Sequence, residues 1–435
     1  MFAVPPTPAM IAFASSWLLA MGVLPWIRVV AHLCAFRFAQ RCASGHSGPF
    51  RAISGHFGLF RAQKKDPIVD FRLTFGSCLR DQLHVLKGTI AHVAPRAHRA
   101  TQGAMGSQQQ TGLRWGILGA GKIASVFAAD AKAAGIRFTA IGARDTGRAR
   151  AFADRFEIGR AHGSYEALCA DPGVDVVYIA TPQAFHAEQA LLAIAAGKHV
   201  LVEKAFTVDA ASARRVFAAA CEAGVFVLEA MWTRFTPTMI AVRERIARGD
   251  IGEVRAITTA HHQKLDLSRA GRHGDPALAG GALLDLGVYA FALALDLLGT
   301  PHSIAAAGRV DVAGVDLGAQ VLLGYPDAGA SLSFSMAHPG PNDASIMGDE
   351  GWIHLDAPYF AWTAFQRHDA SRPARLVESW EPYAASGMNG TRGMQFQALE
   401  LERSVAAGLQ ESPLMPHAHT LAVLEAMDAA RAQLR

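Results

Sequence analysis

The chain has 435 residues, 51% of them hydrophobic and 41 of them glycine, so it is long enough for two or three domains with sizeable cores. Its net charge of +4 is unevenly distributed: residues 1–104 carry 12 of the 41 Lys and Arg but only 3 of the 37 Asp and Glu, which gives +9, and the remainder carries −5. The two cysteines after residue 104 exclude a disulfide framework or a cysteine zinc site there and indicate a reducing compartment, which we take to be the cytoplasm.

Residues 1–104 do not have the pattern of a folded domain. The first 27 residues are uncharged and largely apolar, but they lack the basic start of a signal peptide, and Pro5, Pro6 and Pro25 shorten any run that could span a membrane. The rest is rich in Arg and His, with no sustained helical or strand period and no nucleic-acid-binding motif. We expect 1–104 to be disordered or to precede a true start at Met105. A membrane anchor and a transit-like targeting segment are the alternatives.

A strand–helix–strand unit follows. The apolar run Leu113–Leu118 predicts a buried strand, and a G-x-G-x-x-A turn begins at Gly119. An alanine-rich stretch, 123–134, predicts a helix, and 138–143 predicts a second strand. A purely structural turn is the alternative, but this context favours the dinucleotide-binding fingerprint of a doubly wound parallel sheet.

Each residue of the turn has a physical role in that interpretation. Gly119 permits the sharp strand-to-helix turn, and Gly121 lets the backbone approach a pyrophosphate closely. Ala124 allows the helix to lie near the strand. The helix starts at Lys122 and Ile123, where unpaired N–H groups favour phosphate. We predict cofactor contacts from both glycines, Lys122 and Ile123.

The tip of the second strand selects between the two nicotinamide cofactors. A carboxylate there accepts hydrogen bonds from the ribose of NAD, whereas an arginine pairs with the 2′-phosphate of NADP. Arg144 stands at the tip, with Asp145 next to it, and Arg148 follows one helical turn later. The sequence therefore favours NADP over NAD, although Arg148 could instead belong to a solvated helix face.

Further polar residues follow the later strands of this sheet. A strand over 174–180 ends at Thr181 and Pro182, and His186 lies on the next helix. A strand over 199–202 ends at Glu203 and Lys204. Because the carboxyl ends of parallel strands line one crevice, we predict that these five residues border the cofactor.

A pocket wall is predicted after the last of these strands, 225–228. Trp232 and Arg234 follow it closely and are candidate substrate-binding residues. Phe235, their neighbour, is equally compatible with core packing.

Taken in order, these stretches resemble the glucose–fructose oxidoreductase / inositol dehydrogenase (Gfo/Idh/MocA) family. The resemblance covers about 113–435 and has no counterpart in 1–104. Its branch with dimeric dihydrodiol dehydrogenases and NADP-dependent D-xylose dehydrogenases is the most similar. The motifs that carry it are GILGAGKIA (Gly116–Ala124), ARD (Ala143–Asp145), DPGVDVVYIATP (Asp171–Pro182), GKHVLVEKAF (Gly197–Phe206), LEAMWTRFTP (Leu228–Pro237), GGALLDLGVYAF (Gly280–Phe291) and ESPLMP (Glu411–Pro416).

The resemblance implies a Rossmann domain followed by an α+β domain with an open, mostly antiparallel sheet that forms a homodimer interface. It implies a catalytic lysine at Lys204 and an acid/base motif on Asp285 and Tyr289. The family's proline after the lysine is Ala205 here, and a cis bond before alanine costs about 3 kcal/mol. We therefore expect a different backbone at Lys204. Two smaller departures are Ala143 for a serine and Gln183 for an asparagine.

The second domain is predicted over 233–435, after a Rossmann domain over 105–232. A helix over 282–298 places Asp285 and Tyr289 on one face. Short alternating segments over 303–367 predict an antiparallel sheet, and two helices close the chain. No metal site is expected, because the nearby histidines have no carboxylate at ligand spacing. They are His261, His262 and His273.

These residues predict an NADP-dependent hydride transfer at a sugar or cyclic vicinal diol. In this hypothesis Tyr289 takes the hydroxyl proton, Lys204 lowers its pKa, and Asp285 positions the lysine or the substrate. A catalytically silent NADP-binding sensor or partner protein of the same fold is the first alternative. A membrane-tethered form of the same enzyme is the second.

Overall fold

The computed structural model describes residues 112–268, 271–382 and 392–434. The expected leader, 1–104, and the expected start at Met105 lie outside the described residues, so both stay predictions.

Six parallel strands form the first sheet, in the order β3-β2-β1-β4-β5-β6. They are β1 (Arg114–Leu118), β2 (Arg137–Gly142), β3 (Arg160–His162), β4 (Val176–Ile179), β5 (His199–Glu203) and β6 (Val227–Ala230). The chain order reverses between β1 and β4, which is where ligands bind in open sheets of this type. Sequence patterns predicted every strand of this sheet except the short β3.

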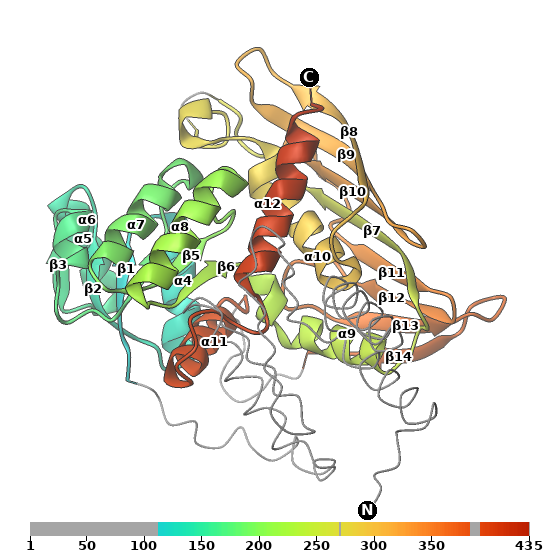
Figure 1. Ribbon diagram of the computed structural model, residues 1–435, viewed down its shortest axis with the longest axis horizontal. Coiled ribbons are helices and arrows are strands. Elements are labelled where there is room, and N and C mark those ends of the chain that lie inside the picture. Colours follow the sequence, from blue (N-terminus) through green and yellow to red (C-terminus); the bar gives the residue numbers. More distant parts are fainter. Residues whose placement is uncertain (1–111, 269–270, 383–391, 435) are drawn as a thin grey trace, which may run out of the picture. The chain divides into compact units, whose positions relative to one another are not determined.

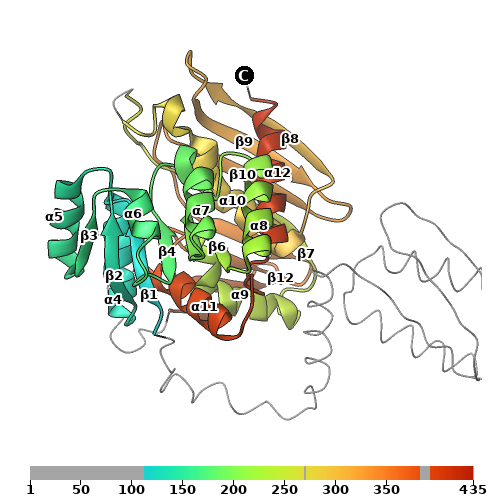
Figure 2. The same cartoon turned by 60° about the vertical axis from the view of Figure 1, so that its left-hand side comes forward.

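Helices cover both faces of this sheet (Figures 1 and 2). One face carries α4 (Lys122–Ala133) and α5 (Thr146–Phe156), and the other carries α6 (Tyr165–Cys169), α7 (His186–Ala195) and α8 (Ala210–Ala223). The turn η1 (Gln183–Phe185) precedes α7.

Late in the chain, α11 (Gln395–Ala406) returns to the first sheet and packs beside α4. The Asp130 carboxylate on α4 accepts hydrogen bonds from the N–H groups of Arg392 and Met394 at 2.8 and 3.2 Å. Trp115 Nε1 donates to Glu402 at 3.0 Å. The two domains therefore interlock, and the division after residue 232 remains a sequence-based prediction.

Eight strands form the second sheet, in the order β14-β13-β12-β11-β7-β10-β9-β8. They are β7 (Val254–His262), β8 (Ser303–Val310), β9 (Asp316–Gly324), β10 (Gly329–Ser335), β11 (Ala344–Gly348), β12 (Gly351–Leu355), β13 (Phe365–Asp369) and β14 (Leu376–Trp380). The predicted open antiparallel sheet is confirmed, with one parallel pair between β7 and β10.

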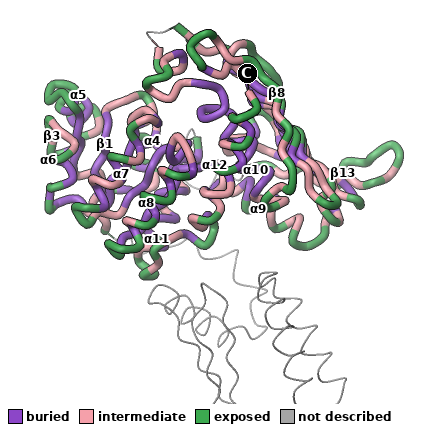
Figure 3. Tube along the Cα trace, turned by 45° about the horizontal axis from the view of Figure 1, so that its top comes forward, coloured by how far each residue is buried: buried purple, intermediate pink, exposed green. Residues whose placement is uncertain are grey.

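Helices cover one face of this second sheet, which is the face toward the first domain (Figure 1). They are α9 (Pro237–Ala247), α10 (Val288–Leu298) and α12 (His417–Arg431). Alternate residues of β9 show the asymmetry: Val321 and Leu323 are buried, whereas Leu322 between them is 59% exposed. Figure 3 shows the buried interior around α10 and the more exposed rim.

One described stretch, Pro276–Leu298, is apolar and long enough to cross a membrane, with a mean hydropathy of 1.8. It comprises the turns η3 (Pro276–Leu278) and η4 (Leu283–Gly287) followed by α10. Because 83% of its most apolar window is buried inside the protein, core packing accounts for its composition.

Candidate active site

The glycine turn lies at the carboxyl ends of β1 and β4. Gly119 has a φ of 107°, and a Cβ there would lie 3.0 Å from the Ala180 carbonyl oxygen and 3.1 Å from Thr181 Cγ2. Its N–H donates to the Gly142 carbonyl at 2.9 Å, which joins the turn to β2. Glycine is therefore required at this position both by backbone conformation and by space.

The same turn leaves the start of α4 open. Gly121 is the N-cap, no side chain caps the helix, and a Cβ on Gly121 would meet only the Ala180 carbonyl, at 3.7 Å. Lys122 is exposed and Ile123 is half-buried. An uncapped helix start beside a glycine backbone fits the pyrophosphate of a dinucleotide, as the sequence predicted.

At the tip of β2, Asp145 caps α5 instead of facing a ribose. Its Oδ1 accepts the backbone N–H of Arg148 at 2.7 Å. The side chains of Arg144 and Arg148 are exposed and form no hydrogen bond or ion pair with any residue that the structure describes. Both guanidinium groups are thus available to a phosphate.

His186 fastens two loops at the edge of the crevice. It is 1% exposed, with Nδ1 2.9 Å from the Ala205 carbonyl oxygen and Nε2 2.9 Å from that of Thr181. Burial lowers its pKa, although the carbonyl contacts act in the opposite direction. Both ring nitrogens of His186 therefore have a backbone carbonyl group as partner. The half-buried Thr181 and Pro182 are left at the crevice edge.

A lysine–aspartate pair connects the two domains. Lys204, directly after β5, donates from Nζ to Asp285 Oδ1 at 2.9 Å and to the Asp285 carbonyl at 2.6 Å. The side chains are only 12% and 9% exposed. Asp285 lies in η4, a single π-helical turn before α10. The predicted helix over 282–298 is confirmed, and within it a wider turn, with i to i+5 hydrogen bonds, carries the carboxylate.

Arg272 and His273 also converge on Asp285, and sequence reasoning did not select either as a site residue. Arg272 Nη2 donates to Oδ1 and Oδ2 at 3.1 and 3.2 Å, and Nη1 donates to Gln183 Oε1 at 3.4 Å. His273 Nε2 lies 3.5 Å from Oδ2. Burial by itself raises the pKa of Asp285, but the Lys204 and Arg272 charges outweigh it and hold that pKa well below its usual range. Both residues lie in a loop rich in His and Arg, and that composition was the sequence feature that could have identified them.

Tyr289 stands beside this pair on α10. Its ring centroid is 4.9 Å from Lys204 Nζ, and its hydroxyl accepts a hydrogen bond from Trp232 Nε1 at 3.0 Å. Burial raises the pKa of Tyr289, and the nearby Lys204 charge opposes that shift without reversing it. The expectation that Lys204 brings this pKa below its ordinary value is therefore wrong, because desolvation is the larger effect.

Two buried glutamates lie behind Lys204. Glu203 Oε1 accepts the hydroxyl of Tyr178 at 2.6 Å, and Glu229 accepts from the Phe206 N–H at 3.1 Å and the Thr420 hydroxyl at 2.9 Å. Burial raises the pKa of each carboxyl to about 7. Glu203, expected at the cofactor, is only 4% exposed.

Arg234, expected to contact substrate, has partners inside the protein. Its Nη1 lies 2.8 Å from Asp296 Oδ1 and 3.1 Å from His419 Nε2. Together with Tyr289 it borders a cavity of about 20 Å³, room for about one water molecule. These contacts anchor the turn η2 (Trp232–Phe235), which carries Trp232.

The peptide bond between Lys204 and Ala205 is cis. The expectation that alanine would give this backbone a different form is therefore wrong.

The three histidines considered for a metal have separate partners. His261 Nδ1 lies 3.1 Å from the Leu286 carbonyl and Nε2 lies 2.9 Å from Gln263 Nε2. His262 contacts Ser333 and His338, and His273 faces Asp285. No cluster of three or more metal-ligating side chains occurs in the described part of the chain.

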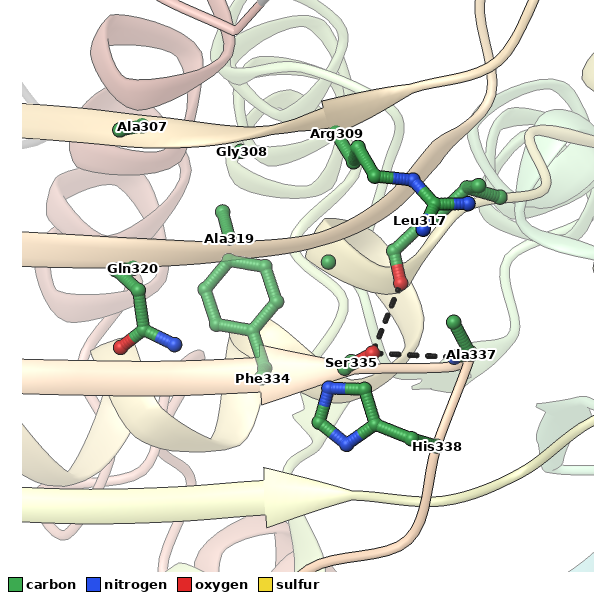
Figure 4. Close-up of a pocket in the computed structure, with 11 residues that line it drawn as sticks. Ala307, Gly308, Arg309, Leu317, Ala319, Gln320, Phe334, Ser335, Ala337 and His338 are labelled. Carbon is green, nitrogen blue, oxygen red and sulfur yellow. Dashed lines mark hydrogen bonds between the residues drawn. The ribbon is translucent and has the colours of Figure 1, made fainter.

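A larger hollow, of about 190 Å³, lies between β8, β9 and β10, away from Lys204, Asp285 and Tyr289 (Figure 4). Ser335 stands in it, donating to the Leu317 carbonyl at 3.3 Å and accepting from the Ala337 N–H at 3.1 Å. None of the residues proposed for chemistry lines this hollow, so we place the candidate site at the crevice between the domains.

A switch-point crevice with an open helix start, together with a lysine at the same edge, defines an NAD(P)-dependent oxidoreductase. Residues 113–231 match the family model for the oxidoreductase family with an NAD-binding Rossmann fold, and residues 239–354 match the GFO/IDH/MocA C-terminal domain. The chain belongs to the Gfo/Idh/MocA oxidoreductase family.

Several curated relatives are trans-1,2-dihydrobenzene-1,2-diol dehydrogenases. The mouse protein is 37% identical over 333 residues, which cover 73% of this chain and 96% of the mouse protein. The human protein is 36% identical over 310 residues, which cover 70% and 91%.

Among solved structures, a 3-ketoreductase from Actinomadura kijaniata, KijD10, in complex with NADP and TDP-benzene is 28% identical, with a TM-score of 0.66 over 74% of this chain and 98% of that protein. Levoglucosan dehydrogenase in complex with NADH and levoglucosan, 20% identical with a TM-score of 0.66, covers 74% of this chain and 97% of its own and shares the fold.

Proposed function

We propose that the protein is an NADP-dependent oxidoreductase that transfers a hydride between nicotinamide C4 and a hydroxyl-bearing carbon of a sugar or cyclic vicinal diol. The observation that carries the proposal is the convergence of three side chains. Lys204, directly after β5 of the first sheet, meets Asp285 and Tyr289 from η4 and α10. Lys204 Nζ is 2.9 Å from Asp285 Oδ1 and 4.9 Å from the Tyr289 ring centroid.

In this proposal Tyr289 is the acid/base. As the tyrosinate it takes the proton from the substrate hydroxyl in oxidation, and as the phenol it returns that proton in reduction. Bound NADP would supply the hydride acceptor or donor. Burial by itself lowers the pKa of Lys204, but the charge of the Asp285 carboxylate and its hydrogen bond outweigh that effect and raise the pKa, so Lys204 stays an ammonium. Its positive charge favours the tyrosinate that forms as the proton moves. Asp285 and Arg272 fix the position of that charge.

The choice of NADP over NAD is supported by Arg144 and Arg148. Their guanidinium groups are exposed and unpaired within the described residues, whereas the one carboxylate nearby, Asp145, is engaged in capping α5. An arginine pair can hold a 2′-phosphate through charge-assisted hydrogen bonds.

The proposed substrate class is supported by the relatives, which include dehydrogenases named for a dihydrobenzenediol and a structurally similar protein bound to levoglucosan. The site itself offers the polar groups of Lys204, Tyr289 and Arg272. We further propose that the protein acts in the cytoplasm. Fractionation of protein expressed from Met1 and from Met105 tests this, because a membrane-bound Met1 product would contradict it.

The test is NADP reduction, followed at the nicotinamide absorbance, with a panel of aldoses and cyclic vicinal diols. We expect at least one compound to be oxidised with NADP and less efficiently with NAD. Tyr289→Phe should lower kcat by about a hundredfold or more, because the proton acceptor is lost while the ring is kept. NADPH binding, followed by fluorescence, should be unchanged.

Normal turnover by Tyr289→Phe would contradict the assignment of the acid/base. NADPH binding without oxidation or reduction of any panel compound would support the alternative of a catalytically silent NADP-binding protein.

A further inference from the structure

We propose that Trp232 is a positioning residue that holds the Tyr289 oxygen as a hydrogen-bond acceptor, so that the phenol's own proton is left for transfer and the tyrosinate is stabilised. Its part in catalysis rests on the proposed function, but the hydrogen-bond relation does not. Trp232 Nε1 lies 3.0 Å from the Tyr289 hydroxyl oxygen.

The direction of this hydrogen bond is fixed by chemistry. An indole N–H can only donate, so the Tyr289 oxygen must accept and its own hydrogen must point elsewhere. No other hydrogen-bond partner of the Tyr289 hydroxyl occurs among the described residues. The contact therefore fixes the orientation of the Tyr289 hydroxyl group. The hydroxyl hydrogen itself is not used in a hydrogen bond to a described residue and can be transferred.

The indole is held in place by its surroundings. Trp232 is 7% exposed and Tyr289 is 8% exposed, and their rings meet edge to face, with centroids 6.4 Å apart. Two residues later, Arg234 anchors the turn through Asp296 at 2.8 Å and donates its backbone N–H to the Met231 carbonyl at 3.0 Å. A donor held this firmly is preorganised for the negative charge that develops on the phenol oxygen.

Trp232 and Lys204 approach Tyr289 differently. Lys204 Nζ lies over the ring, 4.9 Å from the centroid, and acts through its charge, whereas Trp232 reaches the oxygen itself. Both favour the tyrosinate, and burial opposes them. The other titratable groups that face Tyr289 are Glu203, Asp285, His261, Tyr178 and Tyr359.

The direct test is an ultraviolet titration of tyrosinate that needs no substrate. The difference between wild type and Tyr289→Phe isolates the ionisation of Tyr289, and the same difference in a Trp232→Phe background isolates it without the donor. We expect the pKa of Tyr289 to rise by about one unit or more without Trp232, which is about a tenfold change in the ionisation constant. Unchanged titration in a variant that still binds NADPH would overturn the proposal.

Trp362→Phe is the matched control. Trp362 is likewise a tryptophan with a buried indole nitrogen, but its Nε1 has no hydrogen-bond partner in the described structure. The same substitution there should leave the Tyr289 titration unchanged. An equal shift in both variants would mean that loss of a tryptophan, and not loss of the donor, is responsible, and the proposal would fail.

A second measurement does not depend on Trp232→Phe folding. In wild type labelled with ¹⁵N-tryptophan, one indole N–H resonance should titrate together with Tyr289, and this titration should vanish in Tyr289→Phe. Absence of any such resonance would contradict the hydrogen bond.

If the wild type oxidises a panel compound, Trp232→Phe should shift the pH limb of kcat upward and lower kcat about tenfold to a hundredfold, the loss expected for a hydrogen bond to a charged group. A change confined to KM would assign Trp232 to substrate binding alone. A wild type inactive with every compound would remove the proposed function, while the titration would still decide the role of Trp232.

Discussion

At the scale of single residues, the buried carboxyls behind Lys204 make stability depend on pH. Burial raises the pKa of Glu203 and of Glu229 to about 7, from ordinary values of 4.5. A carboxyl whose pKa is higher in the folded than in the unfolded state binds its proton more tightly when folded. Its contribution to stability is complete below about pH 4.5 and is lost as the pH rises through about 7.

We therefore predict that Glu229→Gln flattens the fall in thermal stability between about pH 5 and pH 7, where Glu229 is protonated in the folded protein and ionised in the unfolded chain. The amide keeps an acceptor for the Phe206 N–H and can donate to the Thr420 hydroxyl, but it does not ionise. Thermal unfolding followed by circular dichroism measures the slope of Tm against pH in each protein.

The control for that comparison is Glu425→Gln, because Glu425 is an exposed partner of Arg214. It should keep the wild-type slope in this range. If Glu229→Gln also kept that slope between pH 5 and pH 7, the pKa of Glu229 would not be raised by folding, and the prediction would fail.

At the scale of elements, the proposed preference for NADP depends on the connection from β2 to α5. Asp145 supplies the N-cap of α5, and the exposed arginines Arg144 and Arg148 stand just before the cap and in the first turn of the helix. The capping hydrogen bond occupies the carboxylate that would otherwise favour a ribose hydroxyl.

Removal of either arginine should therefore raise the KM for NADP about tenfold to a hundredfold and leave the KM for NAD nearly unchanged. Arg144→Ala and Arg148→Ala are the variants, and steady-state kinetics with each cofactor is the measurement. Arg150→Ala, an exposed arginine of α5, is the control and should change neither value. An equal loss with both cofactors would argue against 2′-phosphate recognition.

At the scale of the whole molecule, the second sheet has one covered face and one bare face. Helices α10 and α12 pack on the first, and no described helix covers the second. Exposed apolar groups such as Leu322 lie there. An exposed apolar sheet face is typical of an interaction surface, and we propose that a second copy of this chain covers it.

The expected outcome is a dimer in size-exclusion chromatography with light scattering, converted to a monomer by Leu322→Lys. Burying the lysine ammonium in the interface would require its desolvation, and the free-energy penalty would exceed the stabilisation from the remaining contacts. Val312→Lys is the control, since Val312 is fully exposed in the turn between β8 and β9. A monomeric wild type would contradict a homodimer.

The sequence by itself determined the local features of this protein. The glycine turn at Gly119, the strand–helix alternation up to α8 and the alternating strands of the second sheet all depend on short-range patterns. The family motifs added Lys204, Asp285 and Tyr289. The strands β3, β11 and β14 and the helix α9 were missed. Three residues, as in β3, are too few for a period, and no capping signal was recognised before Pro237.

Only the tertiary structure decided which side chains meet in the candidate site and how burial shifts their pKa values. Trp232 meets Tyr289 across 57 residues of chain, Lys204 meets Asp285 across 81, and Arg272 is drawn to the same carboxylate. The π-helical turn and the raised pKa values of Tyr289, Glu203 and Glu229 likewise follow from packing and burial. These properties arise between residues distant in sequence, so no local pattern contains them.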